Sequence, residues 1–123
     1  MATMKVIVAD DSRVMRQIVI RTLRQAGYDW WDIEEAEHGA DALERVRATR
    51  PDFVLSDWNM PEMTGIELLR TMRAEGDETP FAFVTSEGSP QMREQAAAAG
   101  ALFLIAKPFT ADTFRETIDP FIA

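Results

Sequence analysis

The chain has 123 residues, of which 46% are hydrophobic and 28% are charged, and this balance is typical of a single globular domain. A net charge of −8 argues against nucleic acid and anionic membranes as partners, because both attract basic proteins. The absence of cysteine excludes disulfides and thiolate metal sites, and the apolar runs are too short for a membrane span or a signal peptide. We therefore expect a cytoplasmic protein. We also expect a monomer.

Five short apolar runs predict β-strands, since most of their residues are β-branched or aromatic. The second run contains two glutamates, and its alternating pattern is typical of a half-exposed edge strand. The five predicted strands are Met4–Ala9, Ile33–Ala36, Phe53–Ser56, Phe81–Thr85 and Ala101–Ala106.

Segments with helical spacing of apolar residues follow each predicted strand. Gly27 ends the first helix, and the fourth begins at Ser89-Pro90 and ends at Gly100. Thr110 is the expected cap of the fifth helix, which Pro120 should shorten or kink. Strand and helix thus alternate five times. This predicts one α/β domain over residues 1–123, with five helices around a doubly wound parallel sheet of five strands.

In a sheet of this kind ligands bind beyond the carboxyl ends of the strands, so the residues at those ends are the candidates for function. Asp10 and Asp11 follow the first strand and Asp57 follows the third, while Thr85 ends the fourth and Lys107 follows the fifth. Three carboxylates at one edge raise one another's pKa unless a cation lies between them. Lys107 is one such cation, and a hard divalent ion is another.

These acids favour Mg²⁺ over zinc, because Mg²⁺ takes oxygen ligands whereas zinc prefers cysteine and histidine, and His38 is the only histidine. We expect Asp11 to bind the metal directly and Asp10 to bind it through water. The backbone carbonyl of Asn59, in a turn restricted by Pro61, is a further candidate ligand.

A carboxylate beside Mg²⁺ can attack phosphorus and form an aspartyl-phosphate. Asp57 is the predicted nucleophile because its strand lies at the centre of the sheet. Lys107 and the Thr85 hydroxyl would stabilise the transferring oxygens. Taken alone, the acids at 10 and 11 could cap the next helix and the Lys-Pro pair could be a turn. Their joint occurrence at the correct strand ends favours the site.

These residues carry a resemblance to the receiver domain of two-component response regulators, and it covers essentially the whole chain. Each matching piece is weak alone, but the order and spacing of the four are specific. The pieces are A-D-D-S at Ala9–Ser12, L-S-D-W-N-M-P at Leu55–Pro61, V-T-S at Val84–Ser86 and A-K-P-F at Ala106–Phe109.

The resemblance implies that Asp57 accepts a phosphoryl group from a sensor histidine kinase or a small phosphodonor, with Mg²⁺ required and Mn²⁺ able to replace it. It gives the metal-ligand role to Asp10, Asp11, Asp57 and the Asn59 carbonyl, and supporting roles to Thr85 and Lys107. The family pattern also implies a flavodoxin-like sheet with the strand order 2-1-3-4-5 and a cis peptide bond before Pro108. The protein would then catalyse only its own phosphorylation and dephosphorylation.

Within the family the sequence is most similar to the CheY-like, single-domain chemotaxis regulators. E-E-A-E-x-G-x-D-A-L at Glu34–Leu43 supports this, and so do Asn59 and Glu87, which in the family tune the lifetime of the phosphoryl group. No output domain is expected after the fifth helix. The resemblance therefore implies signalling by protein binding, with a chemotaxis kinase, a flagellar motor switch and a phosphatase as possible partners.

The sequence departs from the family at Leu104, where an aromatic residue usually acts as a switch. Phe103 cannot replace it, because successive strand residues face opposite sides of the sheet. We therefore expect activation to move the Thr85–Gly88 loop and the fourth helix without an aromatic swing. By resemblance the target-binding face comprises Gln91, Gln95, Leu104, Ala106, Phe109, Thr110, Thr113 and Thr117.

Two further features have open interpretations. Of the adjacent Trp30 and Trp31, one is expected to pack on the core and the other to be exposed, as ordinary surface or as a contact site. The arginines of the first helix are expected to form a solvated face, or by resemblance a contact with the kinase. They are Arg13, Arg16, Arg21 and Arg24.

Three other functions compete with chemotaxis signalling. A stand-alone receiver could shuttle phosphate in a phosphorelay or act as a phosphate sink, and the sequence barely separates these from the first reading. A metal-dependent phosphohydrolase would need a carboxylate where Asn59 stands, to act as general acid and base. A flavin-binding protein would need a phosphate loop after the first strand, where A-D-D-S-R instead repels phosphate unless a metal is present.

Overall fold

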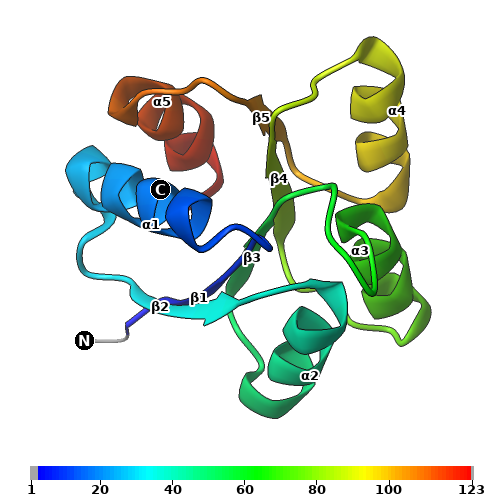
Figure 1. Cartoon of the computed structure of the whole chain (residues 1–123). Helices are drawn as coiled ribbons and strands as arrows, with labels where there is room; N and C mark the ends of the chain where they lie inside the picture. The colour runs from blue at the N-terminus through cyan, green and yellow to red at the C-terminus, as the bar shows by residue number, and fades with distance from the viewer. Residues whose placement is uncertain (1–2, 123) are drawn as a thin grey trace.

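The computed structural model describes residues 3–122 as five strands that alternate with helices (Figure 1). A π-helical turn, η1, extends the first helix, and Gly27 within it has the left-handed backbone that ends the segment. In chain order the elements are β1 (Lys5–Ala9), α1 (Arg13–Leu23), η1 (Arg24–Tyr28), β2 (Asp32–Ala36), α2 (Gly39–Thr49), β3 (Phe53–Ser56), α3 (Gly65–Ala74), β4 (Phe81–Thr85), α4 (Pro90–Ala99), β5 (Leu104–Ala106) and α5 (Ala111–Ile122).

All neighbouring strands are parallel, and their order is β2-β1-β3-β4-β5, which confirms the predicted topology. Figure 1 shows α1 and α5 on one face of the sheet and α2, α3 and α4 on the other. Each face has its own apolar core, because alternate residues of the buried strands point to opposite sides. No helix within residues 3–122 is long and apolar enough to span a bilayer.

Two details at the C-terminal end differ from the prediction. The last strand begins at Leu104 rather than Ala101, although the Leu102 amide already donates to the Phe81 carbonyl at 2.8 Å. Pro120 does not shorten α5, which continues to Ile122. A proline so close to the end disturbs only the last turn, where few intrahelical hydrogen bonds remain to be lost.

The edge strand β2 is half-exposed, as predicted, and both of its glutamates bind arginines. Glu34 accepts from Arg45 at 2.7 Å and Glu35 from Arg16 at 2.9 Å. The tryptophan prediction is also confirmed, since Trp31 is buried while 51% of the surface of Trp30 is exposed. The edge of the sheet is thus held by ion pairs on one side and by an aromatic cluster at the entrance to the strand.

Candidate phosphoacceptor site

The three predicted acids meet at the carboxyl end of the sheet. β1 and β3 are neighbours, and Ala9 lies opposite Ser56 in their register, so the residues that follow the two strands come side by side. The Asp57 amide donates to the Ala9 carbonyl at 2.8 Å and extends this pairing by one residue. As a result, carboxylate oxygens of Asp10, Asp11 and Asp57 all lie within 4.8 Å of one another.

Asp10 is the buried member of the group, with 3% of its surface exposed. One of its oxygens accepts the Ser12 amide at 2.9 Å, and the other lies 3.4 Å from the ammonium group of Lys107. Ser12 caps α1, with its hydroxyl accepting the Met15 amide at 3.2 Å. Because serine fills the cap position, the two aspartates are left to form the site.

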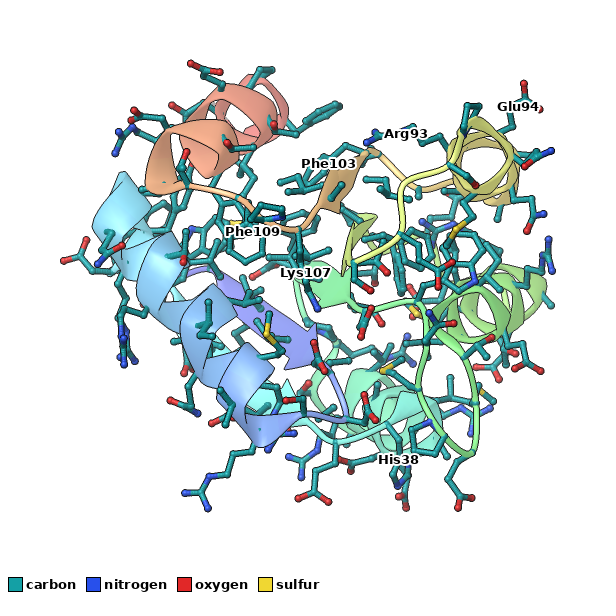
Figure 2. The ribbon with its side chains drawn as sticks, turned by 45° about the horizontal axis from the view of Figure 1, so that its top comes forward. His38, Arg93, Glu94, Phe103, Lys107 and Phe109 are labelled. Atoms are coloured by element: carbon teal, nitrogen blue, oxygen red, sulfur yellow. The ribbon has the colours of Figure 1, made fainter. Side chains whose placement is uncertain are left out.

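Lys107 is the positive charge at this edge, and Figure 2 shows it at the end of β5, pointing toward the centre of the site. Its ammonium nitrogen lies 3.9 Å from an oxygen of Asp57, in addition to its contact with Asp10. The peptide bond that follows it, to Pro108, is cis, as the family resemblance implied. Among residues 3–122, Lys107 is the only lysine or arginine within 4.0 Å of these carboxylates, so one positive charge faces a group of three acids.

The pKa of the Asp57 carboxyl is raised above its usual value, first by burial and then by the charge of Asp10. Lys107, the Trp58 amide and the Thr85 hydroxyl oppose this rise. The Trp58 amide donates to an Asp57 oxygen at 2.7 Å and fixes the orientation of that carboxylate. An additional cation nearby would therefore stabilise the ionised form of Asp57.

The turn after β3 is compact because it doubles back onto Asp57. The Gly65 amide donates to the Trp58 carbonyl at 2.8 Å, and a Cβ atom on Gly65 would lie only 2.1 Å from the Asp57 carbonyl oxygen. Trp58 is buried against Phe83, with ring centroids 4.7 Å apart. Gly65 is thus a site-shaping residue that the sequence analysis missed, because only the tertiary contact identifies it.

Thr85 ends β4 as predicted and is fully buried. Its hydroxyl accepts the Glu87 amide at 3.5 Å, a long contact that holds the start of the next loop only weakly. The amide group of Asn59 donates to the Glu87 carboxylate at 3.4 Å. The two residues assigned to lifetime tuning thus contact each other at the exposed rim of the site.

The position of Arg16 differs from the expectation that the arginines of the first helix form a solvated face. It is buried, and its guanidinium donates to the Asp10 carbonyl at 2.7 Å and to Glu35 at 2.9 Å. It therefore holds the backbone of the β1–α1 turn in place. Its spacing along α1 carried no signal for this, because the partners come from two other segments.

The donor set suits Mg²⁺ and does not suit zinc. Carboxylate oxygens dominate it, and they are hard ligands. His38 lies at the start of α2, where its Nδ1 atom accepts the Asp41 amide at 3.1 Å, and Figure 2 shows it well apart from Lys107. Asp10, Asp11 and Asp57 are the residues that would hold the cation, and the cation would neutralise their repulsion.

The expected target-binding face lies on α4, β5 and α5. Gln91, Gln95 and Thr110 are exposed there, while Phe109 is partly covered and stacks on Phe114. Leu104 is an exception, because only 7% of its surface is exposed and it packs in the core beneath α4. Its prediction as a surface residue was wrong, since its strand turns it inward, whereas Phe103 packs on the opposite face as expected.

A family model described as the response regulator receiver domain matches residues 6–119. The chain belongs to this family. It is 41% identical over 119 residues to the chemotaxis protein CheY1 of Helicobacter pylori, covering 94% of each protein. It is 40% identical over 118 residues to chemotaxis protein CheY-3 of Vibrio cholerae, covering 94% of this chain and 89% of that protein.

Solved receiver domains have the same fold. The Vibrio cholerae chemotaxis protein CheY4 superposes with a TM-score of 0.84 at 36% identity, over 97% of this chain and 98% of that one. The receiver domain of NarL from Mycobacterium tuberculosis gives a TM-score of 0.83 at 28% identity, over 98% and 96%. This receiver domain is therefore a relative of the CheY chemotaxis proteins, a class of phosphoacceptor signalling proteins rather than classical enzymes.

Proposed function

We propose that Asp57 accepts a phosphoryl group and that the resulting charge switches a protein-binding face on α4, β5 and α5. The observation that carries this proposal is the group of three clustered carboxylates with one lysine beside two of them. Such a group has an unmet demand for positive charge, which a Mg²⁺ ion with a phosphoryl donor satisfies. In this proposal one receiver domain acts by itself, through protein contacts.

The transfer uses groups that the fold already positions. An oxygen of Asp57 attacks phosphorus, a new oxygen–phosphorus bond forms, and the bond to the donor's leaving group breaks with its electron pair. Lys107 and the Thr85 hydroxyl interact with phosphoryl oxygens, and Mg²⁺ supplies charge neutralisation when bound. Asp10 and Asp11 hold the cation, assisted by the Asn59 carbonyl, and Mn²⁺ has the same preference for oxygen ligands.

For the pathway, we propose a chemotaxis histidine kinase as donor and a flagellar motor switch as target, because the curated relatives are chemotaxis proteins. A phosphatase that shortens the signal is a further expected partner. The Asn59–Glu87 pair at the rim would tune the access of water to the phosphorylated aspartate. A phosphorelay shuttle or a phosphate sink is the second candidate, and it would use the same site.

The test is incubation with acetyl phosphate and Mg²⁺, followed by intact mass spectrometry. We expect one added phosphoryl group in the wild type and none in Asp57→Asn. Steady release of phosphate from phosphomonoesters without an adduct would contradict the proposal and favour a phosphohydrolase. If the adduct forms, binding of the phosphorylated protein to flagellar switch proteins separates chemotaxis from a relay or a sink.

A further inference from the structure

Arg93 on α4 bridges two segments that surround the fourth helix. Its Nη1 atom donates to the Leu104 carbonyl of β5 at 2.9 Å, and its Nε atom donates to the Gly88 carbonyl of the β4–α4 loop at 3.3 Å. Figure 2 shows the side chain reaching from α4 toward β5. A planar guanidinium can serve two acceptors at once, which one ammonium group does less well.

The Leu104 carbonyl is available because β5 is the edge strand of the sheet. Phe103 accepts the Phe83 amide of β4, so the next carbonyl along the strand points to the open side. Arg93 covers that position. The guanidinium thereby attaches α4 to the sheet at β5, beyond which no strand lies within residues 3–122.

The Gly88 end of the bridge is closely packed. A Cβ atom on Gly88 would lie 3.1 Å from the Cβ of Ala106 and 3.2 Å from the Nη2 atom of Arg93. The loop backbone therefore lies directly against β5, with the guanidinium at its side. Movement of this loop away from β5 must therefore break the hydrogen bond of Arg93 to Gly88 or its hydrogen bond to Leu104.

The same loop begins at the hydroxyl that faces Asp57. The Thr85 hydroxyl accepts the amide of Glu87, the residue directly before Gly88, at 3.5 Å. This contact is lost if the hydroxyl turns toward a phosphoryl group. Leu104 is buried and its side chain has no hydroxyl, so it cannot form a hydrogen bond that follows the movement of Thr85. Another side chain would have to couple the Thr85–Gly88 loop to the target-binding face.

We propose that Arg93 is a positioning residue that clasps the Thr85–Gly88 loop to β5 in the unphosphorylated protein, and that phosphorylation of Asp57 releases the clasp. The inference rests on the proposed function, which supplies the phosphoryl group. Release frees the guanidinium and uncovers the Leu104 carbonyl on the face expected to bind the target. The clasp thus opposes activation until the phosphoryl group recruits Thr85.

The test compares Arg93→Ala and Arg93→Lys with the wild type, with Arg70→Ala on α3 as a matched control. Arg70 is an exposed helical arginine with no hydrogen-bond partner among residues 3–122. Alanine is the best helix former, so the Arg93→Ala variant keeps α4. Hydrogen exchange of the 86–93 segment is measured without a phosphodonor, and the rate of phosphorylation by acetyl phosphate with Mg²⁺ is measured by intact mass.

We expect Arg93→Ala to speed both exchange in this segment and phosphorylation by about three- to tenfold, because two charge-assisted hydrogen bonds, one exposed and one partly buried, are lost. Arg93→Lys should bring both rates part of the way back to the wild-type values, and Arg70→Ala should match the wild type. Wild-type exchange and phosphorylation rates in Arg93→Ala would overturn the clasp. If even the wild type took up no phosphoryl group, the proposed function would fail, while the exchange measurement would still test the clasp.

Discussion

Two groups of acids lie on neighbouring strands and are treated in opposite ways. On β2, Glu34 and Glu35 each bind an arginine at hydrogen-bond distance. At the ends of β1 and β3, three carboxylates lie within 4.8 Å of one another, and Lys107 stands 3.4 Å and 3.9 Å from two of them. Paired acids therefore hold the edge of this fold, whereas the under-neutralised acids form the site at which we propose that a cation and a phosphoryl group bind.

The largest effect is expected from the loss of Lys107, because it removes the only ammonium group beside Asp10 and Asp57 within residues 3–122. We expect Lys107→Ala to slow phosphorylation by acetyl phosphate by about 100-fold or more, since a positioned charge stabilises the transferring oxygens. The rate is followed by intact mass. A rate within twofold of the wild type would mean that the lysine has no part in transfer.

Arg16 links the two groups, because it binds both Glu35 and the backbone of Asp10. Arg16→Met should lower the free energy of unfolding by about 2–3 kcal/mol, less than for a fully buried pair because Glu35 is partly exposed. Urea unfolding measures the loss. Replacing the arginine and Glu35 together should be milder, since no charge is then left unpaired.

Asp57→Asn should stabilise the unliganded protein by roughly 1 kcal/mol, or a few degrees in Tm, after allowance for solvent screening. The pKa of Asp57 is raised in the folded state by burial and by Asp10, so ionisation costs folding free energy. The cost is absent at acid pH and appears as the pH rises through the unfolded and folded pKa values. Thermal unfolding across this range should therefore show the advantage of the variant growing with pH; a constant difference would contradict it.

The smallest effect is expected for Arg45 of α2, the partner of Glu34 on β2. Arg45 is about two-fifths exposed, as is Glu34, so their ion pair is screened by water. Arg45→Met should change the free energy of unfolding by less than about 1 kcal/mol and should leave phosphorylation unaffected. An effect as large as that of Arg16→Met would show that burial does not decide the strength of these pairs.

The sequence predicted most of this arrangement because it depends on short-range patterns. Alternating apolar runs and helix caps predicted the strands and helices, and the family resemblance implied the strand order that brings Asp10, Asp11 and Asp57 to one edge. What escaped prediction depends on contacts between distant segments. From the sequence Arg16 was expected on the surface, but it binds Glu35 and the Asp10 carbonyl. Gly65 had the pattern of an ordinary helix start, and only the close approach of the Asp57 backbone shows why glycine is required there.

Leu104 shows the same limit at the target-binding face. Its position in the last strand was clear from the sequence, but whether its side chain faces solvent depends on how α4 packs over β5. The proposed clasp by Arg93 could not be predicted either, because no local sequence pattern indicates that a helical arginine will bind the Leu104 carbonyl of an edge strand. Local sequence therefore predicted which residues meet at the strand ends, and tertiary packing decided how each is held.

The central claim is that the under-neutralised acids form a cation site, and calorimetric titration with Mg²⁺ alone tests it most directly. We predict saturable binding of one ion to the wild type, at least tenfold weaker binding in Asp11→Ala, and wild-type binding in Glu34→Gln, the matched change on β2. Equal binding in all three proteins, or none in the wild type, would contradict the account.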